Sequence, residues 1–517
     1  MKKLFNFLYL LVACFALQIG VANAVSYANA PFFPNGEFRW ASDGEANVPY
    51  VFHDPLDEKH ITGFEYELME KISQYLDVKS VFVQNGWDGL IPGLTRGDMY
   101  KAVIDGLEIT PEHEEAALFT HPYYVTSEKI VIRRSDLAKK DWSSLNSLKG
   151  LVVGTVNNSA AVRMIEKAGG TLKGYDEETN LFADLKNNRL DAILVDTPIA
   201  MYYQTNGLIV TDESFGRISY GIALDKKDKQ LCDILNKALK HVSESGELHQ
   251  ILARWNLWTP LMADYTKDHS EKNIAPEAWD NYHRIMENMM GTSLKSLLLR
   301  YASFLPAIAH GALMTVVVSI LGMCIAVSLG VVLALGRHYG NRFFRTLCVF
   351  YIETVRGTPL LIQILFIFYA LPSWGITLSP FWAGVGALGL NYAAYEAENY
   401  RAGLISVPKG QMEAAQALNF TRLQALRFII TPQAFRSVLP VMVNDFISLL
   451  KDSSLVSVIT LTDLTQVYVR LSATYYDYIG PGLMVAVAYL LLGLPFVRLA
   501  NYAERRIGKA MVHGGHH

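Results

Sequence analysis

The chain lacks the P-loop pattern G-x-x-x-x-G-K-[ST] that cradles nucleotide phosphates, which excludes ATP hydrolysis by that route. It also lacks any marked excess of charge, because its formal net charge is −3 over 517 residues. This balance does not suggest a polyanionic partner such as nucleic acid. Of the four cysteines, only Cys232 lies within residues 25–258. That segment therefore has no internal disulfide, and its stability must come from an ordinary core.

Long uncharged runs are missing between residue 25 and about residue 305 and become frequent after it. A soluble half therefore precedes a membrane half. The first 24 residues are typical of a signal peptide, with Lys2 and Lys3, an apolar stretch and the A-x-A cleavage site at 22–24. Two other interpretations are open, namely retention as a membrane anchor and lipidation at Cys14. In each case the segment that follows is exported.

Residues 25–258 alternate short β-rich runs with amphipathic helical patterns. Strands are predicted at 39–42, 129–133, 151–155 and 192–195, and helices at 65–75, 231–242 and 246–255. Such alternation predicts an α/β fold with mostly parallel sheets.

An ordered series of short segments in this half resembles the polar amino-acid solute-binding proteins of family 3. The segments are PYVF (49–52), GFEYEL (63–68), WDGLIPGL (87–94), GLEITPE (106–112), PYY (122–124), DTP (196–198) and YGIA (220–223). The resemblance implies a bilobed periplasmic-binding-protein fold of type II in which a ligand is trapped between closing lobes. It places lobe 1 at about 35–123 and 220–258, and lobe 2 at about 126–218.

In that family an arginine clamps the carboxylate of an α-amino acid and an aspartate takes its ammonium group. The resemblance matches Asp196 to the aspartate, Trp87 to an aromatic wall, and Ser159 to a hydroxyl that helps to hold the carboxylate. The arginine is missing, and His113 stands at its position. Glu108 stands where the family usually has Ser or Thr.

Asn47 stands where a second aromatic residue is common, so the cleft departs from its family in several places. A carboxylate at Glu108 would repel a ligand carboxylate and attract a cation, and with Asp196 and either Asp43 or Glu45 it makes the cleft acidic. We therefore predict a cationic ligand. In the alternative interpretation His113 is a surface residue and Glu108 is turned aside or paired with a lysine. The predicted ligand-binding residues are Asp43, Asn47, Trp87, Gly106, Glu108, Thr110, His113, Ser159 and Asp196.

The membrane half is predicted to be all-α with five spans. The uncharged run 357–395 is too long for one helix and is broken by Pro372, Gly375 and Pro380 into two. The other spans are predicted at 312–335, 434–450 and 478–497. An exported N-terminal half and five spans put the C-terminus in the cytoplasm, and the basic residues of the inside loops agree. The remaining segments are a linker at 259–300, a transmembrane domain at 301–510 and a tail at 511–517.

The segment 406–433 resembles the EAA loop of ABC importer permeases. It contains SVPKGQ (406–411), EAA (413–415) and TPQA (431–434), and flanking matches are YIE (351–353), RGTP (356–359) and KDSSL (451–455). The resemblance implies that two short helices dock on a cytoplasmic ATPase and transmit its closure to the spans. The residues it assigns to this coupling are Gly410, Glu413, Ala414, Ala415, Asn419 and Pro432. Asn419 replaces a glycine, and because Asn tolerates left-handed backbone the turn is predicted to survive.

Three carboxylates, Glu396, Glu398 and Asp445, are predicted at membrane depth, where charge is costly. They either pair with Arg401 or Arg436, or line the translocation path.

Together these features predict an ABC importer subunit of the bacterial inner membrane, with its amino-acid or amine receptor on the outer side. ATP would bind a separate ATPase subunit, and two permease domains would pair as a homodimer or heterodimer. The sequence assigns no cofactor, metal or catalytic residue to this chain. Rival functions are a ligand-gated channel, a transmembrane sensor, and an enzyme that uses Glu108 and His113 as acid and base. The EAA loop argues against a channel, and no signalling domain follows the last predicted span.

Overall fold

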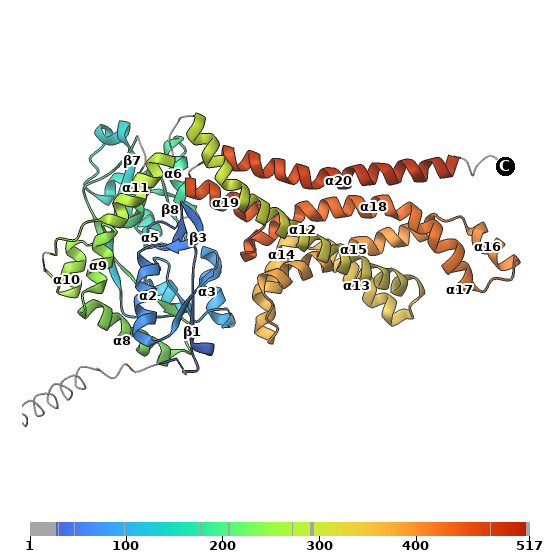
Figure 1. The fold of residues 1–517 in the computed structure, drawn as a ribbon, viewed down its shortest axis with the longest axis horizontal. Coiled ribbons are helices and arrows are strands. Elements are labelled where there is room, and N and C mark those ends of the chain that lie inside the picture. The colour runs from blue at the N-terminus through green and yellow to red at the C-terminus, as the bar shows by residue number, and fades with distance from the viewer. Residues whose placement is uncertain are drawn as a thin grey trace, which may run out of the picture. The chain divides into compact units, whose positions relative to one another are not determined.

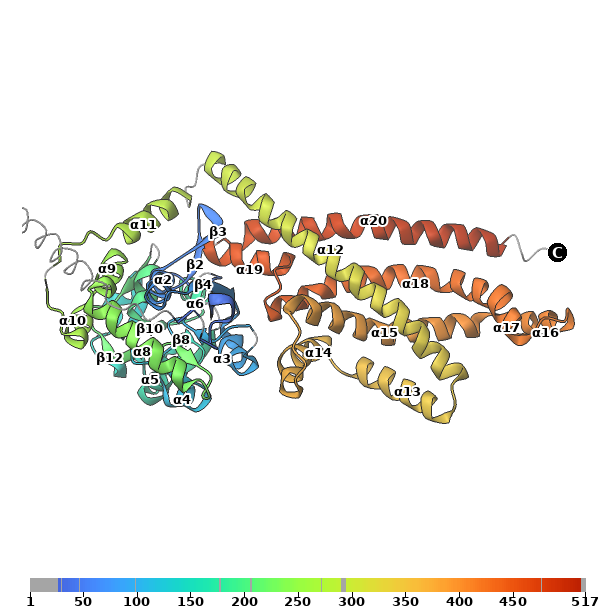
Figure 2. The ribbon, with the colours of Figure 1, turned by 60° about the horizontal axis from the view of Figure 1, so that its bottom comes forward.

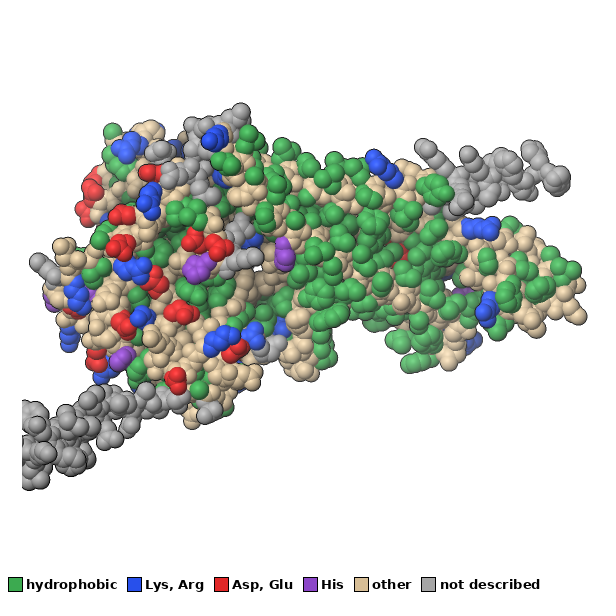
Figure 3. All heavy atoms as spheres, viewed as in Figure 1, with side chains coloured by type: hydrophobic (Ala, Val, Ile, Leu, Met, Phe, Trp, Pro, Cys, Tyr) green, Lys and Arg blue, Asp and Glu red, His purple; other side chains and the backbone are tan. Residues whose placement is uncertain are grey.

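The computed structural model describes residues 27–512, apart from 29, 46, 98, 176, 177, 205, 206, 271, 290–293 and 476. The predicted signal peptide and residues 513–517 of the predicted tail lie outside the described residues. The chain divides into two compact units, residues 1–286 and 287–517 (Figure 1). On the face shown in Figure 3, charged side chains are spread over the first unit, whereas apolar side chains cover most of the second.

Lobe 1 of the first unit is built on a five-stranded sheet in the order β4-β1-β5-β13-β6. The strands are β1 (Glu37–Ser42), β4 (Lys79–Gln84), β5 (Ala102–Val103), β6 (Leu118–Phe119) and β13 (Ala223–Leu224). A separate hairpin pairs β2 (Phe52–Asp54) with β3 (Asp57–Thr62). The helices are α2 (Phe64–Leu76), α3 (Trp87–Arg96), α4 (Pro111–Ala116), α8 (Lys229–Glu244) and α9 (Glu247–Arg254). The helix α2 is amphipathic, because Leu68, Ile72 and Leu76 are buried along one face.

Lobe 2 is built on a six-stranded sheet in the order β11-β7-β10-β8-β9, with β12 paired to β7. The strands are β7 (Tyr124–Arg133), β8 (Val152–Val156), β9 (Thr171–Tyr175), β10 (Ala192–Asp196), β11 (Leu208–Val210) and β12 (Phe215–Tyr220). The helices are α5 (Ala160–Ala168), α6 (Glu178–Lys186) and α7 (Thr197–Tyr202). The chain crosses between the lobes twice, from β6 into β7 and from β12 into β13, which confirms the predicted bilobed α/β fold.

The sheets are mixed, whereas the sequence predicted mostly parallel ones. The pairs β1–β4, β1–β5, β8–β9 and β8–β10 are parallel, as strand–helix–strand units require. Pairs that involve β7 or β13 are antiparallel. These two strands follow the crossings between the lobes, so the chain enters each sheet against the direction of the strand–helix–strand units.

Residues 260–286, which the sequence assigned to a linker, belong to the first unit. They form α10 (Pro260–Thr266) and most of α11 (Glu277–Met289). Trp279 of α11 packs edge-on against Tyr202 of α7, with ring centroids 4.5 Å apart, and Tyr282 packs against Phe52 of β2 at 5.6 Å. This aromatic packing extends the binding domain beyond its predicted end at residue 258.

The second unit is helical (Figure 2). Its helices are α12 (Leu294–Tyr339), α13 (Arg342–Gly357), α14 (Leu360–Leu365), α15 (Pro380–Ser406), α16 (Lys409–Ala417), α17 (Arg422–Ala425), α18 (Thr431–Asp452), α19 (Leu464–Tyr475) and α20 (Ile479–Val512). Glycines let α12 and α15 approach closely. A Cβ on Gly330 would lie 2.8 Å from Glu396 Cβ, and one on Gly389 would lie 2.7 Å from Ile325 Cβ.

Two of the described helices are long and apolar enough to cross a membrane, over residues 297–339 and 479–499. A third span is counted if the pair 342–357 and 360–374, which is bent by 109°, is a single broken one. The predicted break between 372 and 380 is present, because α15 begins at Pro380. The helices α15 and α18 carry charged residues such as Glu396 and Asp445 and fall outside this count, so five spans stay a prediction.

We expect Gly154→Val to destabilise lobe 2, because Gly154 of β8 has no room for a side chain. A Cβ there would lie 2.5 Å from Leu190 Cδ1 and closer still to Leu181 Cδ1, and both leucines are buried. Overpacking of this kind costs about 1–3 kcal/mol. Thermal unfolding of the purified full chain should show it as a lower transition temperature. Thr171→Val is the control, because it also introduces a valine but at an exposed position of β9. It should leave the transition temperature unchanged.

Candidate functional sites

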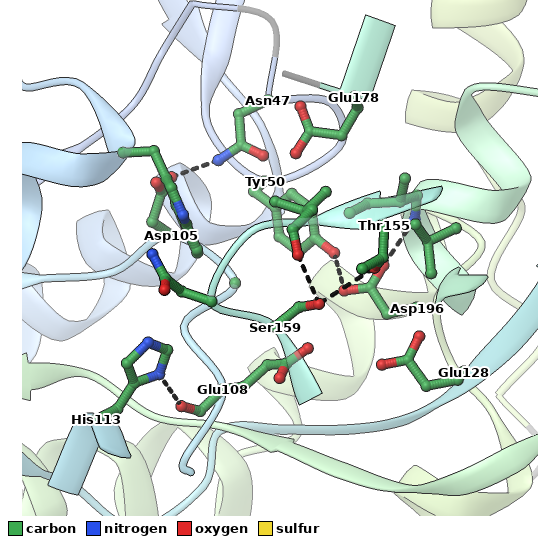
Figure 4. A pocket seen from close by; sticks show the side chains of 16 residues that line it. Asn47, Tyr50, Asp105, Glu108, His113, Glu128, Thr155, Ser159, Glu178 and Asp196 are labelled. Carbon is green, nitrogen blue, oxygen red and sulfur yellow. Dashed lines mark hydrogen bonds between the residues drawn. The ribbon is translucent and has the colours of Figure 1, made fainter. Parts of the chain in front are cut away.

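A small cavity of about 30 Å³ lies between the two lobes (Figure 4). Both lobes contribute to its lining. Seven of the nine predicted ligand-binding residues line it, namely Asn47, Trp87, Gly106, Glu108, His113, Ser159 and Asp196.

The other two predicted residues lie beside the cavity and support its walls. The side chain of Thr110 caps α4 by accepting the N–H of His113 at 3.2 Å, and it lines a neighbouring groove. Asp43 accepts the N–H of Trp87 at 2.9 Å and the side-chain amide of Gln84 at 2.9 Å. Asp43 therefore orients the first residue of α3 rather than facing the cavity.

Asp196 stands at the end of β10 and caps α7 by accepting the N–H of Ile199 at 3.1 Å. Its other oxygen accepts the hydroxyl of Tyr50 from lobe 1 at 2.8 Å, and also the hydroxyl of Tyr220 from β12. Burial raises the pKa of Asp196, and the hydrogen bonds from both tyrosines oppose that rise. Sequence reasoning missed Tyr50 as a site residue, although it lies in the segment 49–52 that carries the family resemblance.

Glu108 faces the cavity from lobe 1, and its carboxylate accepts the backbone N–H of Ala160 in lobe 2. His113 is 9% exposed, and its Nδ1 lies 2.7 Å from the backbone oxygen of Glu108. The structure thus places both side chains at the cavity. Together with an ion pair of 2.9 Å between Arg163 and Glu112, the Glu108 contact joins the lobes in a closed arrangement.

Three further carboxylates line the cavity and were missed, namely Asp105, Glu128 and Glu178. Only Asp105 had a sequence signal, since it directly precedes the segment 106–112. Burial raises the pKa of Glu108 and of Glu178 to about 8. Burial, followed by the charges of Glu108 and Asp196, raises the pKa of Glu128 well above its usual value.

The sixteen described residues that line the cavity therefore include five carboxylates and neither Lys nor Arg. Figure 4 shows Glu108, Glu128 and Asp196 on one side of the cavity and Asn47 and Glu178 on the other.

In the second unit, the predicted coupling residues lie on α16, the turn after it and the first turn of α18. Glu413 and Ala414 are exposed, whereas Ala415 is buried, and a Cβ on Gly410 would meet no other described part of the chain beyond its own helix backbone and neighbours within 4 Å. Asn419 has φ of 68°, the left-handed backbone expected there. Pro432 lies in the first turn of α18, where a missing N–H is tolerated.

The same loop exposes large apolar side chains that sequence reasoning did not select. Leu418 is 72% exposed and Leu423 is 76% exposed. They flank the turn at Asn419, so an apolar surface accompanies Glu413 and Ala414 on this loop.

The three carboxylates predicted at membrane depth have different surroundings. Glu398 accepts hydrogen bonds from Arg337 and from Arg401, the latter at 2.8 Å. Glu396 is fully buried. Asp445 accepts the side-chain amide of Asn399 at 2.6 Å and lines a polar cavity within the helical unit.

A closed bilobed receptor followed by a helical unit with an exposed two-helix loop defines a class of protein, a membrane permease that carries its own solute receptor. Residues 39–257 match the bacterial extracellular solute-binding proteins of family 3. Residues 326–509 match the binding-protein-dependent transport system inner membrane component family.

Several curated relatives that match are permeases. The arginine transport system permease protein of Bacillus subtilis is 35% identical over 204 residues, which are 39% of this chain and 93% of that protein. The L-cystine transport system permease protein of the same organism is 38% identical over 212 residues, 40% of this chain and 89% of that protein. The putative glutamine transport system permease protein of Rickettsia bellii is 34% identical over 211 residues, 41% of this chain and 97% of that protein.

Among solved structures, the crystal structure of an amino acid ABC transporter with histidines is 38% identical, covering 40% of this chain and 97% of that one, with a TM-score of 0.39. The permease matches decide the assignment: the chain belongs to the binding-protein-dependent transport system inner membrane component family. It is an inner-membrane ABC importer subunit with a fused solute-binding domain, a transport component rather than an enzyme.

We expect Asp196→Ala to weaken ligand binding about 10- to 150-fold, because a charge-assisted hydrogen bond contributes about 1.5–3 kcal/mol. The loss also removes the acceptor shared by Tyr50 and Tyr220. Calorimetric titration of the full chain in lipid nanodiscs with arginine, lysine and putrescine measures the effect. Asp212→Ala, at an exposed position of lobe 2, is the matched control. Equal affinities for Asp196→Ala and the parent chain would remove Asp196 from the site.

Proposed function

We propose that this chain imports a cationic solute, a basic amino acid or a related amine, across the bacterial inner membrane. The observation that carries the proposal is the lining of the interlobe cavity, which has five carboxylates and no Lys or Arg among its described residues. Closure strips water from the ligand, so each buried charge needs an opposite partner. A positively charged ligand supplies that partner, whereas a dicarboxylate would meet the acidic side chains with no Lys or Arg of the described lining to compensate, and with His113 alone as a basic residue.

The names of the relatives do not decide the substrate, because arginine, cystine and glutamine differ in charge. The preference is therefore argued from the cavity alone. Asp196 is the proposed ammonium ligand, Trp87 the aromatic wall, and Glu108 the residue that disfavours a ligand carboxylate. Asn47, Gly106, His113 and Ser159 complete the wall, and Asp43 and Thr110 hold it in place.

In the proposed arrangement the binding domain lies outside the membrane, five spans form the permease, and the loop around Asn419 meets a separate ATPase in the cytoplasm. Exposed Glu413 and Ala414, with the apolar Leu418 and Leu423 nearby, support docking of another protein on this loop. ATP is held by that partner. We propose a homodimer of permease domains, because each chain already carries its receptor.

Asp445 is the proposed contributor to the translocation path, since it lines a polar cavity of the helical unit together with Asn391, Tyr392 and Asp452. Glu398 is instead compensated by Arg337 and Arg401, which supports a structural role. A ligand-gated channel or sensor would not need the exposed coupling loop, so no observation favours those alternatives.

Affinity for a cation should rise with pH between about 6 and 8. In the closed, ligand-free cleft burial raises the pKa of Glu108 and Glu178 to about 8, so both carboxyls hold protons at neutral pH. A bound cation favours their ionised forms and lowers these pKa values, so binding releases protons. Each proton released raises affinity about tenfold per pH unit below the free pKa.

Calorimetry of the full chain with lysine and with putrescine, in two buffers of different ionisation enthalpy, measures both the affinity and the number of protons released. Affinity that falls as the pH rises, or net uptake of protons on binding, would contradict a cationic ligand.

Substitution of the coupling loop should separate ATP hydrolysis from uptake. Ala414→Trp places a bulky side chain on the proposed docking surface, and we expect uptake by the chain with its ATPase in proteoliposomes to fall at least about tenfold. Gln416→Trp is the matched control, because its side chain points about 200° around α16 from Ala414. Unimpaired uptake by Ala414→Trp, or ATP hydrolysis by the purified chain alone, would contradict the proposed coupling.

A further inference from the structure

The anion-binding end of α5 is already occupied by the protein itself. This nine-residue helix begins at Ala160, next to Ser159 of the cavity lining, and a helix N-terminus attracts negative charge. The N–H of Ala160 donates to the carboxylate of Glu108, which reaches across from lobe 1. A ligand carboxylate would have to displace Glu108 to reach this position.

Three other groups that could hold a ligand carboxylate are engaged as well. The hydroxyl of Ser159 donates to the backbone oxygen of Val156 at 2.8 Å, so it bonds within its own segment. Arg163 lies beside the cavity rather than in its lining, and it pairs with Glu112 at 2.9 Å. His113 bonds through Nδ1 to the backbone of Glu108 at 2.7 Å. Ser159, Arg163 and His113 are therefore each bonded to acceptors of the protein itself.

Acceptors, by contrast, are in surplus. Glu128 is 1% exposed, and neither of its carboxylate oxygens has a hydrogen-bond partner among the described residues. Asp105 is 2% exposed, and its Oδ2 likewise has no such partner in the described part of the chain, while its Oδ1 accepts from Ser42 and Asn47. One of these carboxylates comes from lobe 2 and the other from lobe 1. Buried acceptors without donors are costly, so a ligand that donates to both carboxylates should bind more tightly than one that does not.

We propose that the ligand is a dicationic amine without a carboxylate, such as a diamine or a guanidino-amine, with one cationic end at Glu128 and Asp196 and the other at Asp105. This proposal rests on the proposed function, import of a cation, and narrows its substrate class. Two cationic ends supply donors to both unpartnered carboxylates. The carboxylate of lysine or arginine would find the N–H of Ala160 occupied and would add a negative charge to an acidic cavity.

The test compares amino acids with the amines formed by their decarboxylation, because each pair differs only in the carboxylate. Calorimetric titration of the full chain in nanodiscs would use lysine with cadaverine, arginine with agmatine, and ornithine with putrescine. We expect the amine of at least one pair to bind at least about 10-fold more tightly than its amino acid. Amino acids that bind as tightly as their amines, or more tightly, would overturn the inference but leave the proposed import of a cation intact. Binding of glutamate or glutamine with no response to any of the six cations would instead overturn the proposed function.

Substitution of Glu108 tests the reason for the preference. Glu108→Ser frees the N–H of Ala160 and removes one negative charge, so the ratio of amine to amino-acid affinity should fall at least about 10-fold. Glu108→Gln retains an acceptor for the N–H of Ala160, so it should weaken amine binding without improving amino-acid binding. This variant replaces Glu108→Ser in the test if the serine variant does not fold. Glu114→Ser is the control, because it removes an exposed carboxylate from α4, the helix that follows Glu108 in the chain. Equal changes for amine and amino acid in Glu108→Ser would overturn the assigned role of Glu108.

Discussion

Asp196 accepts hydrogen bonds from the hydroxyl of Tyr50 in lobe 1 and from the hydroxyl of Tyr220, which ends β12 where the chain returns to lobe 1. One carboxylate therefore joins the two lobes at the cavity. In the closed cleft Asp196, Glu108 and Glu128 are all buried. Burial first, and then the negative charges of neighbouring carboxylates, raise the pKa values of Glu108 and Glu128, and the described lining contains neither Lys nor Arg. The closed cleft therefore depends on compensation of this charge, by protons when it is empty and by a cation when it is filled.

In the permease unit, unlike the cleft, one carboxylate has arginine partners. Glu398 is compensated by Arg337 of α12 and Arg401 of its own helix, and small residues such as Gly330 let α12 and α15 come close enough for this pairing. Asp445, by contrast, bonds to the neutral Asn399 and faces a polar cavity. A carboxylate that has a guanidinium partner stabilises packing, whereas Asp445, which faces a polar cavity, is the one that we propose for the translocation path.

Features that depend on contiguous residues were predictable. Alternation of strands and helices, the ordered family segments and the long apolar runs placed the receptor before the permease, and the left-handed turn at Asn419 followed from its residue type. The mixed sheets were not predictable in this way, because the direction of β7 is set by where the chain crosses between lobes. Nor was the extension of the first unit through α11, which depends on the contact of Trp279 with the distant Tyr202.

The sequence by itself determined the class of the protein and part of its cleft, because Asp196, Trp87 and the loss of an arginine at position 113 can be recognised within short family segments. Only the tertiary structure decided how acidic that cleft is. Asp105, Glu128 and Glu178 come from separate segments of the chain, and nothing in the local sequence of Glu128 or Glu178 distinguishes them from carboxylates that face water. The lobes must close before Glu108 can reach the N–H of Ala160, so the chemistry that selects the ligand arises from contacts between residues 52 positions apart.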